Sequence, residues 1–181
     1  MKKIMLVLCT MMVATFAAAQ STAGAATTEL SPAEKSIAAA RKAISEKPTE
    51  YAGYNLLAMA LVCRAQETSD SDFLTRAEDA VRQSFAIAPN NFETEKIKVT
   101  ILLGEHEYPA ALDVAKALNK RVPDDVMVYG LLTDANVELG NYKDAEDSAQ
   151  WMLNLRRGNR PAFIRAAHFA SYSVRRRAHM N

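Results

Sequence analysis

The sequence predicts an all-α protein built as a solenoid of helical hairpins, and three observations support this prediction. Apolar residues recur at spacings of three and four, and no stretch of useful length alternates as a strand does. The stretch Leu102–Pro123 contains the end of one helix, a tight turn and a complete second helix. The residues that end its helices recur at near-constant spacing, since a proline stands at Pro89 as at Pro123. The order Leu-Gly, then Tyr-x-x-Ala, returns from Leu139, with a turn expected to be one residue shorter.

The composition suits one helical domain. Of the 181 residues, 49% are hydrophobic and 24% are charged, with few glycines and prolines. A body of about 150 residues can bury a real core. The two cysteines, Cys9 and Cys63, allow no disulfide framework and no cysteine-built metal site. Cys63 follows the apolar run Leu57–Val62, so we expect its thiol to be buried.

Charge divides the chain into an acidic body and a basic tail. Residues 20–155 hold 13 Lys and Arg against 21 Asp and Glu, whereas residues 156–181 hold 7 Arg and no acidic residue. The tail either belongs to an incomplete or capping repeat, or it binds an anionic partner such as a membrane surface or an acidic protein. Nucleic acid is not expected as a partner, because the body adds no basic patch.

The N-terminal segment has the pattern of an export signal. Residues 1–3 carry two lysines, residues 4–16 are almost wholly apolar, and the alanines at 17–19 give a small-x-small cleavage site. The apolar run favours a cleaved signal peptide over an anchor, since a membrane span takes about 20 residues. We therefore expect residues 1–19 to be a signal peptide, residues 20–30 to be a disordered lead-in, and the protein to be exported to a bacterial periplasm.

The first ordered elements are a single helix and a long hairpin. Ser31 and Glu34 form a capping box with proline between them, which predicts a helix that ends near Pro48. A second helix is expected from about Thr49 to Gln66, and its partner follows a polar break and ends before Pro89. The apolar stripes of these helices are Ile37, Ala40, Ala43 and Ile44; Tyr54, Leu57, Ala58 and Leu61; and Phe73, Ala77, Val81 and Phe85.

Two more hairpins and a last helix follow. The second hairpin begins at Phe92, and the third begins after Pro123, where Asp124 and Asp125 can cap a helix N-terminus. A last helix is expected from Pro161, and no partner helix follows it. The apolar stripes are Ile97, Ile101 and Leu102; Ala111, Ala115 and Leu118; Tyr129, Leu132 and Ala135; Ala145, Ala149, Met152 and Leu153; and Phe163, Ala166, Ala167, Ala170 and Val174.

On these positions the sequence resembles the tetratricopeptide repeat (TPR) family, whose period is about 34 residues. The matching residues are Tyr54, Leu57, Ala58, Ala77 and Pro89; Gly104, Tyr108, Ala111, Ala115 and Pro123; and Tyr129, Leu132, Gly140, Tyr142, Ala145 and Ala149. The resemblance implies a right-handed solenoid of about three repeats with a half-repeat helix at each end. The implied units, within a solenoid of residues 31–178, are a half repeat at 31–48, repeats at 51–91, 92–125 and 126–159, and a terminal helix at 160–178. About seven extra residues in the first repeat lengthen either its helices or its turn.

No pattern for catalysis, a cofactor or a metal is found in the sequence, so we expect a protein that is not an enzyme. His106, His168 and His179 have no cysteine or carboxylate at zinc-ligand spacing. The sequence has no Gly-rich phosphate loop and no nucleophile elbow.

The resemblance implies that a protein or peptide binds along a concave groove lined by the first helix of each repeat. The groove positions it implies are Asn55, Met59 and Val62; Lys96, Thr100 and Leu103; Gly130, Asp134 and Val137; and Ile164 and His168. Some family members hold a C-terminal carboxylate at such positions. Only Asn55 and Lys96 are similar to that clamp, and Met59 and Asp134 contradict it, so a carboxylate clamp is not expected.

The leading hypothesis is an exported scaffold or adaptor of the cell envelope that binds a protein or peptide. The alternative is a structural protein that self-associates, or docks on a membrane surface, through the basic C-terminal helix that carries Arg175, Arg176 and Arg177. A third hypothesis is that the chain is the front part of a longer repeat array.

Overall fold

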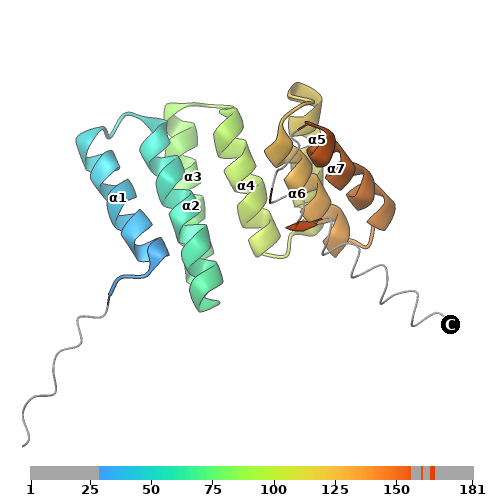
Figure 1. Cartoon of the computed structure of the whole chain (residues 1–181). Coiled ribbons are helices and arrows are strands. Elements are labelled where there is room, and N and C mark those ends of the chain that lie inside the picture. The colour runs from blue at the N-terminus through green and yellow to red at the C-terminus, as the bar shows by residue number, and fades with distance from the viewer. Residues whose placement is uncertain (1–28, 156–159, 161–163, 166–181) are drawn as a thin grey trace, which may run out of the picture.

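The computed structural model describes residues 29–155, 160, 164 and 165, and within them it contains seven α-helices and no strand. The helices are α1 (Pro32–Glu46), α2 (Tyr51–Thr68), α3 (Asp72–Ile87), α4 (Phe92–Gly104), α5 (Tyr108–Arg121), α6 (Val126–Glu138) and α7 (Tyr142–Leu155). They stack in one row as helical hairpins (Figure 1), which confirms the predicted all-α solenoid. The expected signal peptide, almost all of the lead-in and most of the terminal helix lie outside the described residues.

Two helix starts predicted from sequence are confirmed by their hydrogen bonds. The Ser31 hydroxyl accepts a hydrogen bond from the Glu34 N–H at 3.2 Å, and the Glu34 carboxylate accepts one from the Ser31 N–H at 2.8 Å. At the start of α6, the Asp125 carboxylate accepts a hydrogen bond from the Val128 N–H at 2.9 Å. Each cap satisfies backbone donors that the helix itself leaves unpaired.

The prediction of a shorter turn in the third hairpin is wrong. In each of the three hairpins the turn between the helices has the same length, at positions 69–71, 105–107 and 139–141. The sequence comparison pairs Gly104 with Gly140, but Gly104 is the last residue of α4. The residue that corresponds to Gly140 (φ +76°) is His106 (φ +63°), one repeat period earlier, because both adopt the left-handed backbone that reverses the chain.

The extra residues of the first hairpin lengthen its helices and leave its turn unchanged. The two helices of this hairpin have 18 and 16 residues, whereas α4 and α5 have 13 and 14. The third hairpin repeats the lengths 13 and 14. The second and third hairpins are therefore equivalent units, and the first extends beyond them.

The contacts between helices divide the stack into two layers. Within the described residues, α2, α4 and α6 contact one another in a row, whereas α1, α3, α5 and α7 contact only members of that row. Helices that touch lie on the inside of a curved stack, and helices that do not touch fan out on the outside. The row α2, α4 and α6, in front in Figure 1, is therefore the inner layer.

Two clusters of buried apolar side chains fill the space between the layers. Ile97 and Ile101 of α4 belong to the first cluster, with α2 and α3, and Val99 belongs to the second, with α5, α6 and α7. Fully buried alanines let the helices approach closely. These alanines are Ala58, Ala77, Ala111, Ala115, Ala135 and Ala145. The fourth helix thus joins the two halves of one continuous core.

Candidate functional site

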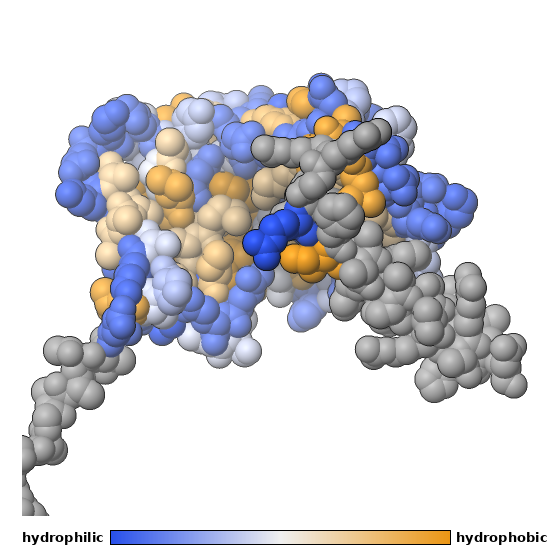
Figure 2. Space-filling view, in the orientation of Figure 1, coloured by the Kyte–Doolittle hydropathy of each residue, from blue (hydrophilic) through white to orange (hydrophobic). Residues whose placement is uncertain are grey.

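The solvent-facing side chains of the inner layer form one surface, termed here the inner face. Its residues are Ala52, Leu56, Met59 and Cys63 on α2; Glu93, Thr100 and Leu103 on α4; and Met127, Asp134 and Val137 on α6. Two of them are large apolar side chains left in solvent, Leu56 at 59% exposed and Met127 at 42%. Figure 2 shows this side of the molecule, where apolar residues gather in the middle and hydrophilic residues lie along the rim. Exposed apolar area of this kind favours contact with another chain.

The groove positions implied by the family resemblance fall into three groups. Met59, Thr100, Leu103, Asp134 and Val137 are partly exposed on the inner face. Three others are buried: Val62, Lys96 and Gly130. Ile164 is 67% exposed, Asn55 is partly buried, and His168 lies outside the described residues. Whether any of these residues binds a peptide stays a prediction.

The side chain of Asn55 is part of a polar network between three helices. The Ser84 hydroxyl donates to the Asn55 carbonyl oxygen at 2.8 Å, and the Thr94 hydroxyl lies 3.0 Å from the same oxygen and 2.8 Å from Ser84. Both Ser84 and Thr94 are fully buried. Asn55, a predicted groove residue, therefore has a packing role, because its carbonyl oxygen accepts hydrogen bonds from both buried hydroxyls.

Lys96, another predicted groove residue, is buried and paired with two carboxylates. The residue is only 5% exposed, and its ammonium lies 3.0 Å from Asp125 and 2.8 Å from Glu93. Burial alone would lower the pKa of Lys96, but the hydrogen bonds to the two carboxylates outweigh it and raise that pKa. Burial alone would raise the pKa of Asp125, yet the Val128 N–H and Lys96 together lower it. Lys96 thus holds α4 against the start of α6.

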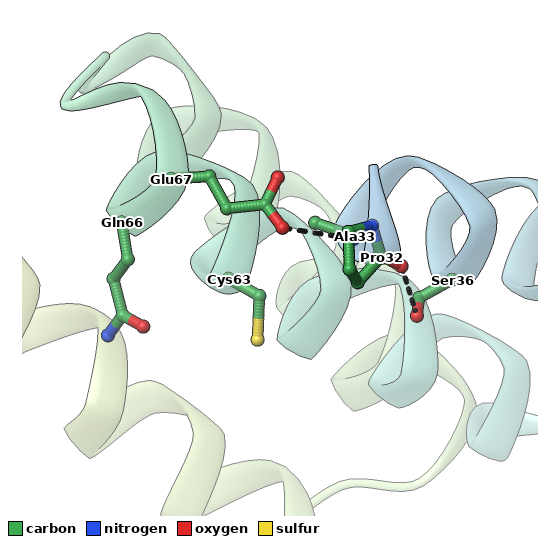
Figure 3. A pocket seen from close by; sticks show the side chains of 6 residues that line it. All are labelled: Pro32, Ala33, Ser36, Cys63, Gln66 and Glu67. Atoms are coloured by element: carbon green, nitrogen blue, oxygen red, sulfur yellow. Dashed lines mark hydrogen bonds between the residues drawn. The ribbon is translucent and has the colours of Figure 1, made fainter. Parts of the chain in front are cut away.

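The thiol of Cys63 is exposed, so the prediction that it is buried is wrong. It points into an open hollow between α1 and α2 that is also lined by Pro32, Ser36 and Gln66 (Figure 3). The apolar run before it does face the core, since Ala60, Leu61 and Val62 are buried. Cys63 follows Met59 by four residues, about one helical turn, and is exposed.

Sequence reasoning missed Leu56 and Cys63 as members of the inner face. The resemblance implies positions 55, 59 and 62 on α2, whereas the structure exposes positions 52, 56, 59 and 63. Spacings of four, three and four mark one side of a helix, so the pattern was present in the sequence. It was hidden because these residues are as apolar as those of the core.

Metal sites and membrane-spanning helices are both absent from the described part of the chain. No group of three His, Cys, Asp or Glu side chains there is placed to hold a metal ion. None of the described helices combines the length and the apolar character that crossing a membrane requires.

No protein-family model and no curated protein matches the chain. Among solved structures, it is similar to MamA, residues 41 to the end, from Desulfovibrio magneticus RS-1. The TM-score is 0.59 at 19% identity, over 82% of this chain and 78% of that chain. A MamA RS-1 structure described as the ArsTM double mutant covers the same shares at 19% identity, with a TM-score of 0.57. MamA is a TPR-containing protein, so the fold of this chain is that of a TPR solenoid.

Proposed function

We propose that this chain, with its TPR fold, is a non-enzymatic scaffold of the cell envelope that binds a protein or peptide partner on the inner face. The fold supports an interaction role in general, since stacked first helices present side chains that packing does not require. The N-terminal export pattern supports the envelope location. The partner's chemistry is set by the inner face, which is apolar in the middle and carries carboxylates at Glu93 and Asp134.

One observation carries the proposal: large apolar side chains stand in solvent on the layer where helices touch. Leu56 and Met127 lie on the first and third helices of that layer, and Met59, Leu103 and Val137 add partly exposed apolar surface between them. An extended peptide or an amphipathic helix that crosses α2, α4 and α6 would bury these groups. Each fully buried side chain of this size contributes about 1.5–3 kcal/mol.

Cys63 allows a direct test, because its thiol is exposed on the inner face. The chain is labelled at Cys63 with a photo-crosslinking maleimide and irradiated in an extract of its own cell envelope. The experiment uses the chain without residues 1–19, which contains Cys63 but not Cys9. The matched control moves this thiol to the outer layer, as Cys63→Ser with Ile87→Cys, since Ile87 is 36% exposed on α3. We expect a partner crosslinked from position 63 and not from position 87.

A second variant links the crosslink to the apolar middle of the inner face. Leu56→Ser and Met127→Ser together should abolish the crosslink from Cys63 while far-ultraviolet circular dichroism stays unchanged, because both side chains are exposed. The proposal fails if the same proteins crosslink from positions 63 and 87, or if the double variant keeps the crosslink.

The location has its own test. A fusion of residues 1–30 to a reporter enzyme that is active only outside the cytoplasm should give activity, and deletion of residues 4–16 should remove it. Activity of the deleted form would contradict an envelope scaffold.

A further inference from the structure

On α6, the third helix of the inner face, Asp134 forms a bidentate ion pair with Arg165. The Arg165 Nε donates to Asp134 Oδ1 at 2.7 Å, and its Nη2 donates to Asp134 Oδ2 at 2.6 Å. The two side chains are 30% and 37% exposed, so the pair lies at the surface and remains open to solvent. Paired N–H donors matched to both carboxylate oxygens are the geometry by which a guanidinium is recognised.

Gly130 forms the floor under this guanidinium. A Cβ atom at position 130 would lie 3.3 Å from the Arg165 Cζ and 3.5 Å from each terminal nitrogen. The arginine therefore lies against bare backbone, in the space where another residue would carry a side chain. Gly130 is itself buried, and beyond its own helix backbone the nearest heavy atoms to that Cβ all belong to Arg165.

The preceding repeat has no equivalent space for a guanidinium, termed here the slot, between a glycine and an aspartate. One repeat period before Gly130 stands Lys96, which is buried and paired with Asp125 and Glu93, and one period before Asp134 stands Thr100. In that repeat a long side chain of the helix itself fills the inner surface, and the position that corresponds to Asp134 is Thr100, which has no carboxylate. The glycine and the aspartate together thus distinguish α6.

We propose that Gly130 and Asp134 form an arginine-binding subsite of the inner face, which takes an arginine of the partner peptide and which Arg165 fills until that partner binds. This inference rests on the proposed function and names the chemistry of the partner. Arg165 comes from a segment with no acidic residue, so no carboxylate of that segment competes with Asp134 for its guanidinium. Two apolar residues of the same helix, Met127 at 42% exposed and the partly exposed Val137, provide contact for the residues beside the arginine.

The slot selects arginine over lysine for a geometric reason. An ammonium is a point charge and can satisfy one carboxylate oxygen well, whereas the planar guanidinium satisfies both and stacks on the glycine backbone. A hydrogen-bonded charge pair of this kind changes binding by about tenfold or more.

The test uses a fluorescent peptide with the sequence of residues 160–169 and a second peptide with Arg165→Lys. Binding is measured by fluorescence anisotropy to the full chain, to Arg165→Ala and to Arg165→Ala with Asp134→Asn. Removal of the internal competitor should tighten binding of the arginine peptide about tenfold or more. Asp134→Asn should reverse that gain, and the lysine peptide should bind the Arg165→Ala chain several-fold more weakly.

A substitute variant covers the case in which Arg165→Ala fails to fold by circular dichroism. Arg165→Lys then replaces it, and it should show a smaller gain in the same direction. Equal binding to all variants, or equal binding of the two peptides, would overturn the inference. Asp134→Asn is also placed in the Cys63 crosslinking experiment: a partner that crosslinks equally with and without Asp134 would overturn the subsite while the proposed function stands.

Discussion

Replacement of Lys96 by methionine tests whether a buried ion pair holds the second and third repeats together. Methionine keeps the apolar stem of the side chain, which is 6% exposed, and removes only the ammonium. Glu93 loses little, because its side chain is 62% exposed and water replaces the partner. Asp125 is 19% exposed and keeps its hydrogen bond from the Val128 N–H, so its lost bond to Lys96 dominates the cost.

The expected loss in the free energy of unfolding is about 2 kcal/mol, the range of one charge-assisted hydrogen bond to a poorly hydrated carboxylate. It is smaller than for a fully buried pair, because Asp125 is partly hydrated and the ammonium no longer has to be desolvated. Urea unfolding followed by circular dichroism should show a lower midpoint with an unchanged slope. A double variant with Asp125→Asn should lose less than the sum of the two single variants.

The control is Lys143→Met, which removes an ammonium at the same 3.0 Å distance from a carboxylate, that of Asp147. Its side chain is 80% exposed, so no loss beyond experimental error is expected. A Lys96→Met chain as stable as the native chain, or equal losses in the two variants, would refute the structural role of the buried pair.

The same pair predicts a pH dependence. The pKa of Asp125 is lowered in the folded state from its ordinary 3.8: burial opposes this, and the hydrogen bonds from Val128 and Lys96 together outweigh it. A lowered carboxylate pKa stabilises the fold above 3.8 and loses that effect as the pH falls through the folded value. The stability difference between the native chain and Lys96→Met should therefore shrink below about pH 4. A difference that stays constant to pH 2 would show that Asp125 is not the group involved.

Three other substitutions and one thiol-labelling measurement have defined outcomes. Thr94→Val removes a fully buried hydroxyl from the network with Ser84 and should cost about 1–2 kcal/mol in urea unfolding; a neutral result would show that the network does not contribute. Gly140→Ala, at φ +76°, should destabilise the third turn by about 1 kcal/mol, whereas His106→Gly, at φ +63°, should be neutral or slightly stabilising in the same assay, and the opposite order would contradict the turn assignment. Cys63 should react with a thiol reagent in the native state at a rate close to that in urea; protection until unfolding would show that the thiol is covered.

The spacing of proline, glycine and tyrosine predicted the helices well, because each of these residues acts within its own turn of chain. The capping box at Ser31 and the aspartate at the start of α6 were predicted for the same reason, because a capping side chain also acts within its own turn of chain. The length of the third turn was predicted wrongly because glycine is the usual residue at positive φ. The sequence comparison therefore pairs Gly104 with Gly140, whereas the structure puts that backbone at His106.

The candidate site was harder to predict, since it depends on which way each helix faces. Asn55 and Lys96 have the polar character of groove residues, but the structure directs them to Ser84 and Asp125 on neighbouring helices. Leu56 has the character of a core residue and is 59% exposed. Polarity predicts burial only on average, because a partner from a distant part of the sequence can satisfy a polar group inside the fold.

The sequence by itself determined the class of fold, the repeat and the helix starts, because periodicity and capping are interactions between near neighbours in the chain. Only the tertiary structure decided which residues of α2, α4 and α6 reach solvent, and only it brings Arg165 onto Asp134 and Gly130 from a much later part of the chain. The physical reason is that helices of similar composition can pack at different rotations about their axes. Contacts between helices, which no local pattern encodes, select one of those rotations.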